Sequence, residues 1–228
     1  QRVAFTYGRR DIGKDLTASA GDLKVGNLAL TCETPFRHWT IAYDGPAQDI
    51  ADGAILVTPA KARPEGWFTP ADLSMTVDIE ALTEPHYAAR GAHGHFEQSI
   101  HATGRLTIGG EEIVFNGYGV RDKSWGPRNW GGSSAASGGA PMTGSTPAAP
   151  NPFVFWFSMN FGADVSLGGS CFRRSDGTMK GEGWIQDGEG MDSFDDVAVE
   201  TRFRPDSILH ETVVLTGRTG KGRAIRIE

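Results

Sequence analysis

The segment 117–130 holds the residues whose types and spacing could do chemistry. It reads Gly-Tyr-Gly-Val-Arg-Asp-Lys-Ser-Trp-Gly-Pro-Arg-Asn-Trp, and Asp122 is its one acid. An acid held against aromatic rings loses hydration, which favours its neutral form and makes it a proton donor near neutral pH. The segment therefore predicts a catalytic proton donor at Asp122, with Trp125 and Trp130 as the wall of a substrate-binding cavity.

Two arginines, Arg121 and Arg128, flank this acid and are assigned to substrate binding. An arginine can also clamp a carboxylate through two parallel hydrogen bonds. If Arg121 pairs with Asp122 in this way, the charged carboxylate is favoured and the acid is not a proton donor. The sequence leaves both arrangements open.

A hairpin must position these residues. The strand-like runs 100–108 and 111–120 are separated by Gly109 and Gly110, which tolerate the positive φ angles of a tight two-residue turn. Side chains alternate along a strand, so the turn fixes which of them share a face. One face of the hairpin is apolar and carries Ile100, Gly104, Leu106, Ile108, Ile113 and Phe115.

The other face of the hairpin carries residues able to move protons, namely His95, Glu97, His101, Tyr118 and Asp122. Glu97 is predicted to lie opposite Asp122, and two carboxyl groups held close together do not both ionise readily. We therefore expect Glu97, His101 and Tyr118 to act catalytically with Asp122, and His95 to contact the substrate. The competing interpretation is a solvated outer face, because one face of an antiparallel sheet is usually wet.

Beyond the hairpin, short strand-like runs alternate with glycine-rich turns, and 31 of the 228 residues are glycine. This pattern is typical of antiparallel sheet in a barrel or a sandwich. We therefore predict an all-β protein with little helix, at most one short turn over 191–196. The other predicted strands are 28–32, 38–43, 73–79, 153–159, 197–203 and 212–215.

The segment 131–150 consists almost entirely of Gly, Ser, Ala, Thr and Pro. Such a composition buries too little apolar surface to offset its ordering entropy, so we predict a loop or linker. A lid is the alternative, because the segment directly follows the aromatic cluster. It divides the chain into a first β domain, 1–130, and a second, 151–228, which ends inside a strand-like run and is expected to be truncated.

The central motif resembles a family signature. Residues 121–126 read Arg-Asp-Lys-Ser-Trp-Gly and are similar to the Arg-Asp-His-Ser-Trp-Gly motif of tandem lipocalin-like proteins in the AttH and carotenoid-hydratase superfamily, with Lys123 in place of the usual histidine. The resemblance also covers Glu97-Gln98, 39–46 and the glycine-rich second half. It implies two lipocalin-like antiparallel β-barrel or sandwich domains packed on each other around an apolar cavity. It also implies metal-independent hydration, dehydration, isomerisation or cyclisation of terpenoid or polyketide chains.

Charge and composition argue against several classes of partner. The net charge of −6 and the pI near 5.5 leave no basic stripe for a nucleic acid. No apolar run reaches the roughly 18 residues that span a membrane. No secretion signal is visible either, so we expect no membrane span and a cytoplasmic location. Cys32 and Cys171 match no disulfide framework and are expected to be reduced thiols.

Other chemistries have weaker support, and we predict neither a metal nor a cofactor. His93 and His95 could join Glu97 and His101 in a nitrogen–oxygen metal site, but they lie on a glycine-rich loop, where chance explains them equally well. Cys171 lacks a nearby base for nucleophilic catalysis. A loose acidic group does not have the spacing of a calcium loop; its members are Asp187, Glu189, Asp192, Asp195 and Asp196.

The function that follows is a metal-independent acid–base enzyme, a hydro-lyase or an isomerase or cyclase, acting on a hydrophobic terpenoid, polyketide or aromatic molecule. The alternative is a non-catalytic, lipocalin-like carrier of a hydrophobic metabolite, in which Arg121 and Asp122 form a structural pair. A third possibility is an interaction scaffold that uses 131–150 as a docking arm. Turnover of a bound ligand separates the first from the second.

Overall fold

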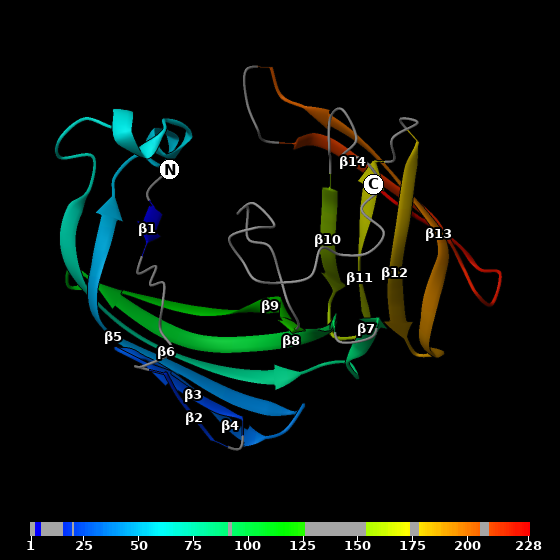
Figure 1. Cartoon of the computed structure of the whole chain (residues 1–228), viewed down its shortest axis with the longest axis horizontal. Coiled ribbons are helices and arrows are strands. Elements are labelled where there is room, and N and C mark those ends of the chain that lie inside the picture. The colour runs from blue at the N-terminus through cyan, green and yellow to red at the C-terminus, as the bar shows by residue number, and fades with distance from the viewer. Residues whose placement is uncertain are drawn as a thin grey trace, which may run out of the picture. The chain divides into compact units, whose positions relative to one another are not determined.

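The computed structural model describes residues 3–5, 16–19, 21–90, 93–125, 154–173, 178–205 and 210–228. Within these ranges the protein is all-β, as predicted, with two short 3-10 helices, η2 (Gly53–Val57) and η3 (Ala60–Ala62) (Figure 1). No helix among the described residues is long and apolar enough to cross a membrane. The strands are β1 (Val3–Phe5), β2 (Leu16–Ser19), β3 (Asp22–Val25), β4 (Leu28–Thr34), β5 (His38–Ile50), β6 (Thr69–Ala81), β7 (His86–Arg90), β8 (His93–Ile108), β9 (Glu111–Trp125), β10 (Val154–Phe161), β11 (Val165–Arg173), β12 (Met179–Asp187), β13 (Gly190–Phe203), β14 (His210–Thr219) and β15 (Ala224–Ile227).

The chain divides into two compact units, and neither is continuous in sequence. The first unit comprises 1–81 and 101–117, and the second comprises 82–100 and 118–228. The predicted domains, 1–130 and 151–228, differ from this division because β8 and β9 each contribute residues to both units. The predicted linker, 131–150, lies outside the described residues.

The first sheet has nine strands in the order β2-β3-β4-β5-β6-β8-β7, with β1 paired to β5 and β9 paired to β8. The long strands β5 and β6 pair antiparallel from His38 opposite Glu80 to Asp49 opposite Thr69, and both bend strongly (Figure 1). Alternate residues of these strands point inward, because the side-chain period of a strand is two. They supply Tyr43 and Leu73 to the core of the first unit.

The predicted hairpin is confirmed. β8 and β9 are joined by Gly109 and Gly110, whose φ angles of 56° and 85° suit the mirror-image turns that match strand twist. The predicted faces also hold where side chains meet. The ring of Phe115 covers Gly104 on the apolar face, and His101 Nε2 lies 2.7 Å from Asn116 Oδ1 on the polar face.

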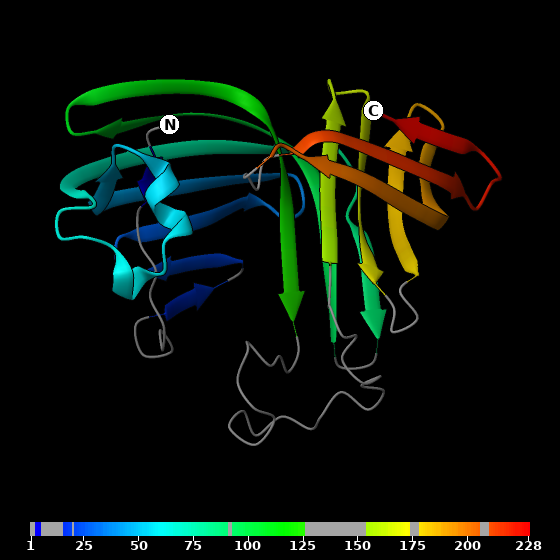
Figure 2. The same ribbon diagram turned by 90° about the horizontal axis from the view of Figure 1, so that it is seen from above.

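The second sheet is a simple antiparallel meander, β10-β11-β12-β13-β14-β15, in which each strand pairs with the next along the chain (Figure 2). The segment 191–196 lies within β13 and is paired to β12, from Phe194 opposite Gly183 to Met191 opposite Gln186, so the prediction of a helical turn there is wrong. The buried core of this sheet consists of Phe157, Leu167, Cys171, Ile185, Phe194, Val197 and Leu215.

The sequence prediction missed β11 and β12, because their glycines interrupt the alternation of apolar and polar residues that marks a strand. These glycines are required by close packing. A Cβ atom on Gly181 would lie 2.6 Å from Val197 Cβ and 2.7 Å from the sulfur of Cys171, and one on Gly169 would meet the carbonyl oxygen of Glu182. Glycine therefore permits chain segments to approach where any other residue would force them apart.

Candidate functional site

Asp122, the predicted proton donor, is exposed in the structure, so the prediction that indole rings sequester it is wrong. Its neighbour is the hydroxyl of Ser124, which donates to Asp122 Oδ1 at 3.4 Å. The reason is that strand β9 continues through the motif as far as Trp125. Asp122 and Trp125 are three positions apart on this strand, so their side chains point to opposite faces.

Arg121 and Trp125 of the motif pack onto β8 from the face opposite Asp122. The ring of Trp125 lies against Gly94, where a side chain would collide with it. The guanidinium of Arg121 stands 4.8 Å from the centre of the Phe96 ring, a cation–π contact. Trp125 and Arg121 therefore cover β8. Trp130 and Arg128, the other predicted members of the cavity wall, lie outside the described residues.

Glu97 is the carboxyl group that the structure places between indoles. Its residue is 3% exposed, and each of its oxygens accepts a hydrogen bond from a tryptophan. Trp156 Nε1 donates to Oε1 at 2.5 Å, and Trp184 Nε1 donates to Oε2 at 3.0 Å. The indole N–H is only a donor, so this geometry uses the group as an acceptor on both oxygens. Strands β8, β10 and β12 meet at this one carboxylate.

A glycine makes room for this arrangement. Gly168 lies on β11 opposite Trp184 of β12. A Cβ atom at this position would lie 2.7 Å from Glu97 Oε2 and 2.9 Å from Trp184 Nε1. Both distances are shorter than real Cβ contacts, so the bare backbone of Gly168 is what lets the carboxylate reach the second indole.

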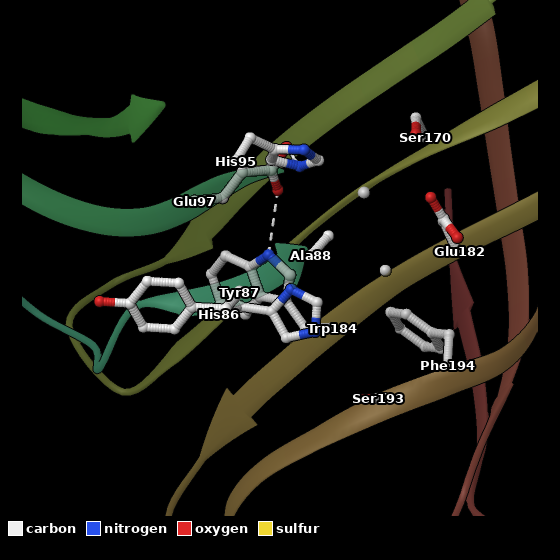
Figure 3. A pocket seen from close by; sticks show the side chains of 12 residues that line it. His86, Tyr87, Ala88, His95, Glu97, Ser170, Glu182, Trp184, Ser193 and Phe194 are labelled. Carbon is white, nitrogen blue, oxygen red and sulfur yellow. Dashed lines mark hydrogen bonds and ion pairs between the residues drawn. The ribbon is translucent and has the colours of Figure 1, made fainter. Parts of the chain in front are cut away.

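A pocket of about 340 Å³ lies beside this carboxylate, within the second unit (Figure 3). Strands β7, β8, β11, β12 and β13 supply its walls. Its lining residues are His86, Tyr87, Ala88, His95, Glu97, Gly169, Ser170, Glu182, Gly183, Trp184, Ser193 and Phe194. The volume is within the range of ligand pockets, and the lining includes rings, imidazoles and carboxylates.

His86 is a residue of the pocket whose pKa is shifted. Its ring stacks on Trp184, with 6.1 Å between ring centres and an angle of 25° between planes. Burial lowers the pKa of His86 below its ordinary value of 6.5, and the neighbouring His95 lowers it further. The carboxylates of Glu97 and Glu182 act in the opposite direction, but burial dominates. At neutral pH His86 is therefore an uncharged imidazole, able to accept a proton.

His95 and Glu97 are two of the nine predicted site residues, and the structure brings them together. They lie two positions apart on β8 and so share a face. His95 Nε2 is 3.9 Å from Glu97 Oε1, and the side chain of His95 is 38% exposed where that of Glu97 is almost covered. His95 thus connects the buried carboxylate with solvent.

The remaining predicted catalytic residues lie elsewhere. His101 belongs to the first unit and contacts Asn116, and Tyr118 is 49% exposed. Neither is among the described residues that line the pocket. The sequence analysis missed His86 and Glu182, since no local pattern distinguishes them.

Metal and thiol chemistry receive no geometric support in the described part of the chain. No group of three or more His, Cys, Asp or Glu side chains there is arranged to hold a metal ion. Cys32 and Cys171 are both free thiols. Burial, followed by the charge of Asp196, raises the pKa of Cys171 to about 11, so this thiol is a poor nucleophile near neutral pH.

The suppressed titration of His86 predicts a pH-dependent stability. The unfolded chain takes up a proton near pH 6.5, whereas the folded state resists it. The unfolded state therefore binds more protons below pH 6.5. The free energy of unfolding should fall as the pH drops through this window, by at most about 1.4 kcal/mol per pH unit for one proton.

Urea unfolding at pH 7.5 and pH 5, both chosen to bracket the usual histidine range of roughly 6.5, measures this effect in wild type and in His86→Gln. The variant cannot be protonated at this position and should lose less stability at the lower pH. His38 acts with the opposite sign, because its hydrogen bond to Asp78 raises its pKa, but it is present in both proteins and cancels. Identical pH dependence in the two proteins would contradict the prediction.

Comparison with known proteins gives a family but no function. A family model described as "Domain of unknown function (DUF7064)" matches residues 2–228. No curated protein and no solved structure matches the chain.

Proposed function

Because the chain belongs to the DUF7064 family, whose function is unknown, we propose a function from the site and from the motif at 121–126: an enzyme that moves protons on a small, largely hydrophobic molecule without a metal. One observation carries the proposal. An imidazole kept neutral by burial, that of His86, lines the same pocket as the buried carboxylate of Glu97. A neutral imidazole is the most common general base, and perturbed titration in a pocket is a mark of functional sites.

In the proposed reaction the imidazole of His86 takes a proton from a C–H or O–H group of the substrate and becomes an imidazolium ion. The electron pair left behind forms a new double bond, either as the electrons of an adjacent C=C or C=O bond shift to the next atom, or as the hydroxyl group on the neighbouring carbon departs. The imidazolium then returns the proton to another carbon, which isomerises the substrate, or to the departing hydroxyl, which leaves as water. The reverse sequence adds water.

The surrounding charges support this cycle. Glu97 and Glu182 favour the charged form of His86, although burial outweighs them at rest. When the imidazolium forms during the reaction, the buried carboxylate of Glu97 stabilises its charge without having to reorganise. Glu97 is held in place by its two indole partners, so it acts as a positioning and electrostatic residue. His95, which reaches solvent, exchanges protons between the pocket and water.

The class of substrate rests on the sequence motif and not on the walls of the pocket. Trp184 is fully buried, and Phe194 pairs with Gly183 and packs in the core of the second sheet. An aromatic, terpenoid or polyketide substrate is proposed from the resemblance of the motif. The relation to the AttH and carotenoid-hydratase superfamily stays a prediction that rests on the motif at 121–126. The role of Asp122 as proton donor receives no support from its exposed position.

A hydrogen–deuterium exchange experiment tests the proposal before the substrate is known. A panel of terpenoid alcohols, diketones and phenols is screened for binding by NMR, and each binder is then incubated with the protein in deuterated water. We expect at least one binder to gain deuterium at carbon, or to gain or lose a water molecule. His86→Gln should bind it normally but react at least about a hundredfold more slowly, the usual size of a general-base contribution.

His210→Gln is the matched control, because His210 is an exposed histidine of the same unit that lies outside the pocket lining. It should react at the wild-type rate. If every binder is recovered from wild type chemically unchanged and free of deuterium, the enzyme proposal is wrong.

A second candidate function is a carrier that does not change its ligand, and the hydrogen bonds of Glu97 favour it. Both oxygens of this carboxylate are already occupied by indole donors, which suits a structural group that joins β8 to β10 and β12. A carrier would return every ligand unchanged in the exchange experiment. Native mass spectrometry of protein purified from its source would then show an unmodified ligand bound to it.

A further inference from the structure

The imidazole of the pocket follows directly after an irregular connection between β6 and β7, residues 82–85, which belongs to no strand. At its start the N–H of Leu82 donates to the carbonyl of Ser99 on β8 at 2.9 Å, and directly after it His86 pairs with Glu97. From Leu82 to His86 the chain advances four positions, but its partner strand β8 advances only two. The connection is therefore a bulge, and its length decides which residue of β7 stands opposite Glu97.

A side chain takes the place of the backbone in this bulge. In a regular antiparallel pair, the N–H of Ser99 would donate back to the carbonyl of Leu82. It donates instead to the hydroxyl of Thr83 at 3.0 Å, while the carbonyl of Thr83 accepts from the side-chain amide of Gln98 at 2.8 Å. Thr83, Gln98 and Ser99 are all buried, so water does not replace a lost partner there. The hydroxyl of Thr83 is thus the acceptor that completes the ladder at the bulge.

A second contact fastens the connection to the other sheet. The N–H of Glu84 donates to Oε1 of Gln186 on β12 at 3.2 Å. Two positions away on β12, the ring of Trp184 stacks with that of His86 (Figure 3). The start of β7 is therefore held against β8 by Thr83 and against β12 by Gln186.

The register of β7 matters directly for the site. Side chains alternate along a strand, so a slip of one residue would turn His86 to the face away from Glu97. A smaller displacement would still separate the imidazole from the indole and admit water. A catalytic group misplaced by about 1 Å can lose about a hundredfold in rate.

We propose that Thr83 and Gln186 are positioning residues of the site. They hold β7 in the register that places His86 beside the buried carboxylate and against the indole. Neither residue is among those that line the pocket, so both act through His86. This inference deepens the proposed function and rests on it for the catalytic role of His86, but the geometry it concerns is measured without a substrate.

The variants Thr83→Val and Thr83→Ser test the inference through the titration of His86, followed by NMR. Valine has the shape of threonine but accepts no hydrogen bond, whereas serine keeps the hydroxyl. The signal of His86 is the one that disappears in His86→Gln. Burial, and then His95, lower the pKa of His86, whereas Glu97 and Glu182 raise it. In Thr83→Val this pKa should rise toward 6.5, because water reaches the released ring, and in Thr83→Ser it should stay at the wild-type value.

Gln186→Met keeps the length of the side chain and removes the acceptor at a half-buried position, so it should shift the pKa in the same direction without unfolding the protein. Thr216→Val is the matched control, because Thr216 is a partly buried threonine of β14 in the same unit, outside the pocket lining. It should leave the titration of His86 unchanged. For any ligand that exchanges deuterium, Thr83→Val should also react about tenfold more slowly or worse, and Thr83→Ser at nearly the wild-type rate.

An unchanged titration of His86 in folded Thr83→Val overturns the inference, as does an equally large shift in Thr83→Ser or in Thr216→Val. If Thr83→Val does not fold, an unchanged titration in Gln186→Met overturns it. The two proposals can also fail separately. If the titration shifts as expected but no ligand exchanges deuterium, the two residues position His86 and the enzyme proposal is wrong. If ligands react and the titration does not shift, the acid–base function stands and the positioning role is wrong.

Discussion

Replacing Glu97 with glutamine should lower the free energy of unfolding by about 1–3 kcal/mol, because one indole N–H would then face an amide NH₂ and lose its acceptor. Trp184 is completely buried, so water cannot replace the lost partner. Glu97→Ala should cost more, because it removes both acceptors and also leaves a cavity between β8 and the second sheet. Urea unfolding followed by circular dichroism measures both losses.

Asp122→Asn is the matched control for this change. It also replaces an acid of the β8–β9 hairpin by its amide, but Asp122 is exposed. Its stability should stay within about 0.5 kcal/mol of wild type, as for most surface substitutions. A double-mutant cycle that combines Glu97→Gln with Trp184→Phe isolates the hydrogen bond itself, because phenylalanine has no N–H to leave unpaired. Additive effects in this cycle would show that the bond contributes nothing.

Gly168→Ala should destabilise the protein by about 1–3 kcal/mol through overpacking. The added methyl group would lie 2.7 Å from Glu97 Oε2, 2.9 Å from Trp184 Nε1 and 3.0 Å from Trp184 Cε2. The carboxylate and the indole must move apart to admit it, so the variant should also change the fluorescence of the native state. Thermal or urea unfolding, together with the native emission spectrum, checks both parts.

Gly117→Ala provides the comparison, because Gly117 also lies within a strand but has open space where its Cβ would be. Alanine there reduces the conformational freedom of the unfolded chain and should leave stability unchanged or slightly raised. If Gly168→Ala proves as stable as Gly117→Ala, the carboxylate is not confined as the structure describes it.

The sequence anticipated the fold where the signal was local. The turn at Gly109 and Gly110 and the alternation along β8 and β9 are short-range features, and both were confirmed. Strands β11 and β12 were missed because their glycines serve contacts with other strands, as Gly181 does with Val197. The sequence also did not predict the division into units, because the segment 82–100 belongs to the second unit although it is separated from 118–228 in the chain.

The sequence predicted an acid beside indole rings but chose Asp122 for it. An acid between indoles exists, but it is Glu97, not Asp122. The error came from expecting the tryptophans of the motif to form a wall around Asp122. On a strand, adjacent side chains point to opposite faces, so the tryptophan of the motif turns away from its acid.

By itself the sequence determined the all-β character, the β8–β9 hairpin and the fact that His95 and Glu97 share a face, because period-two alternation and glycine turns depend only on nearby residues. Only the tertiary structure decided which indoles meet the carboxylate of Glu97. Trp156 and Trp184 lie 59 and 87 positions further along the chain. Such distances are closed by the packing of whole strands, which leaves no mark in any local pattern.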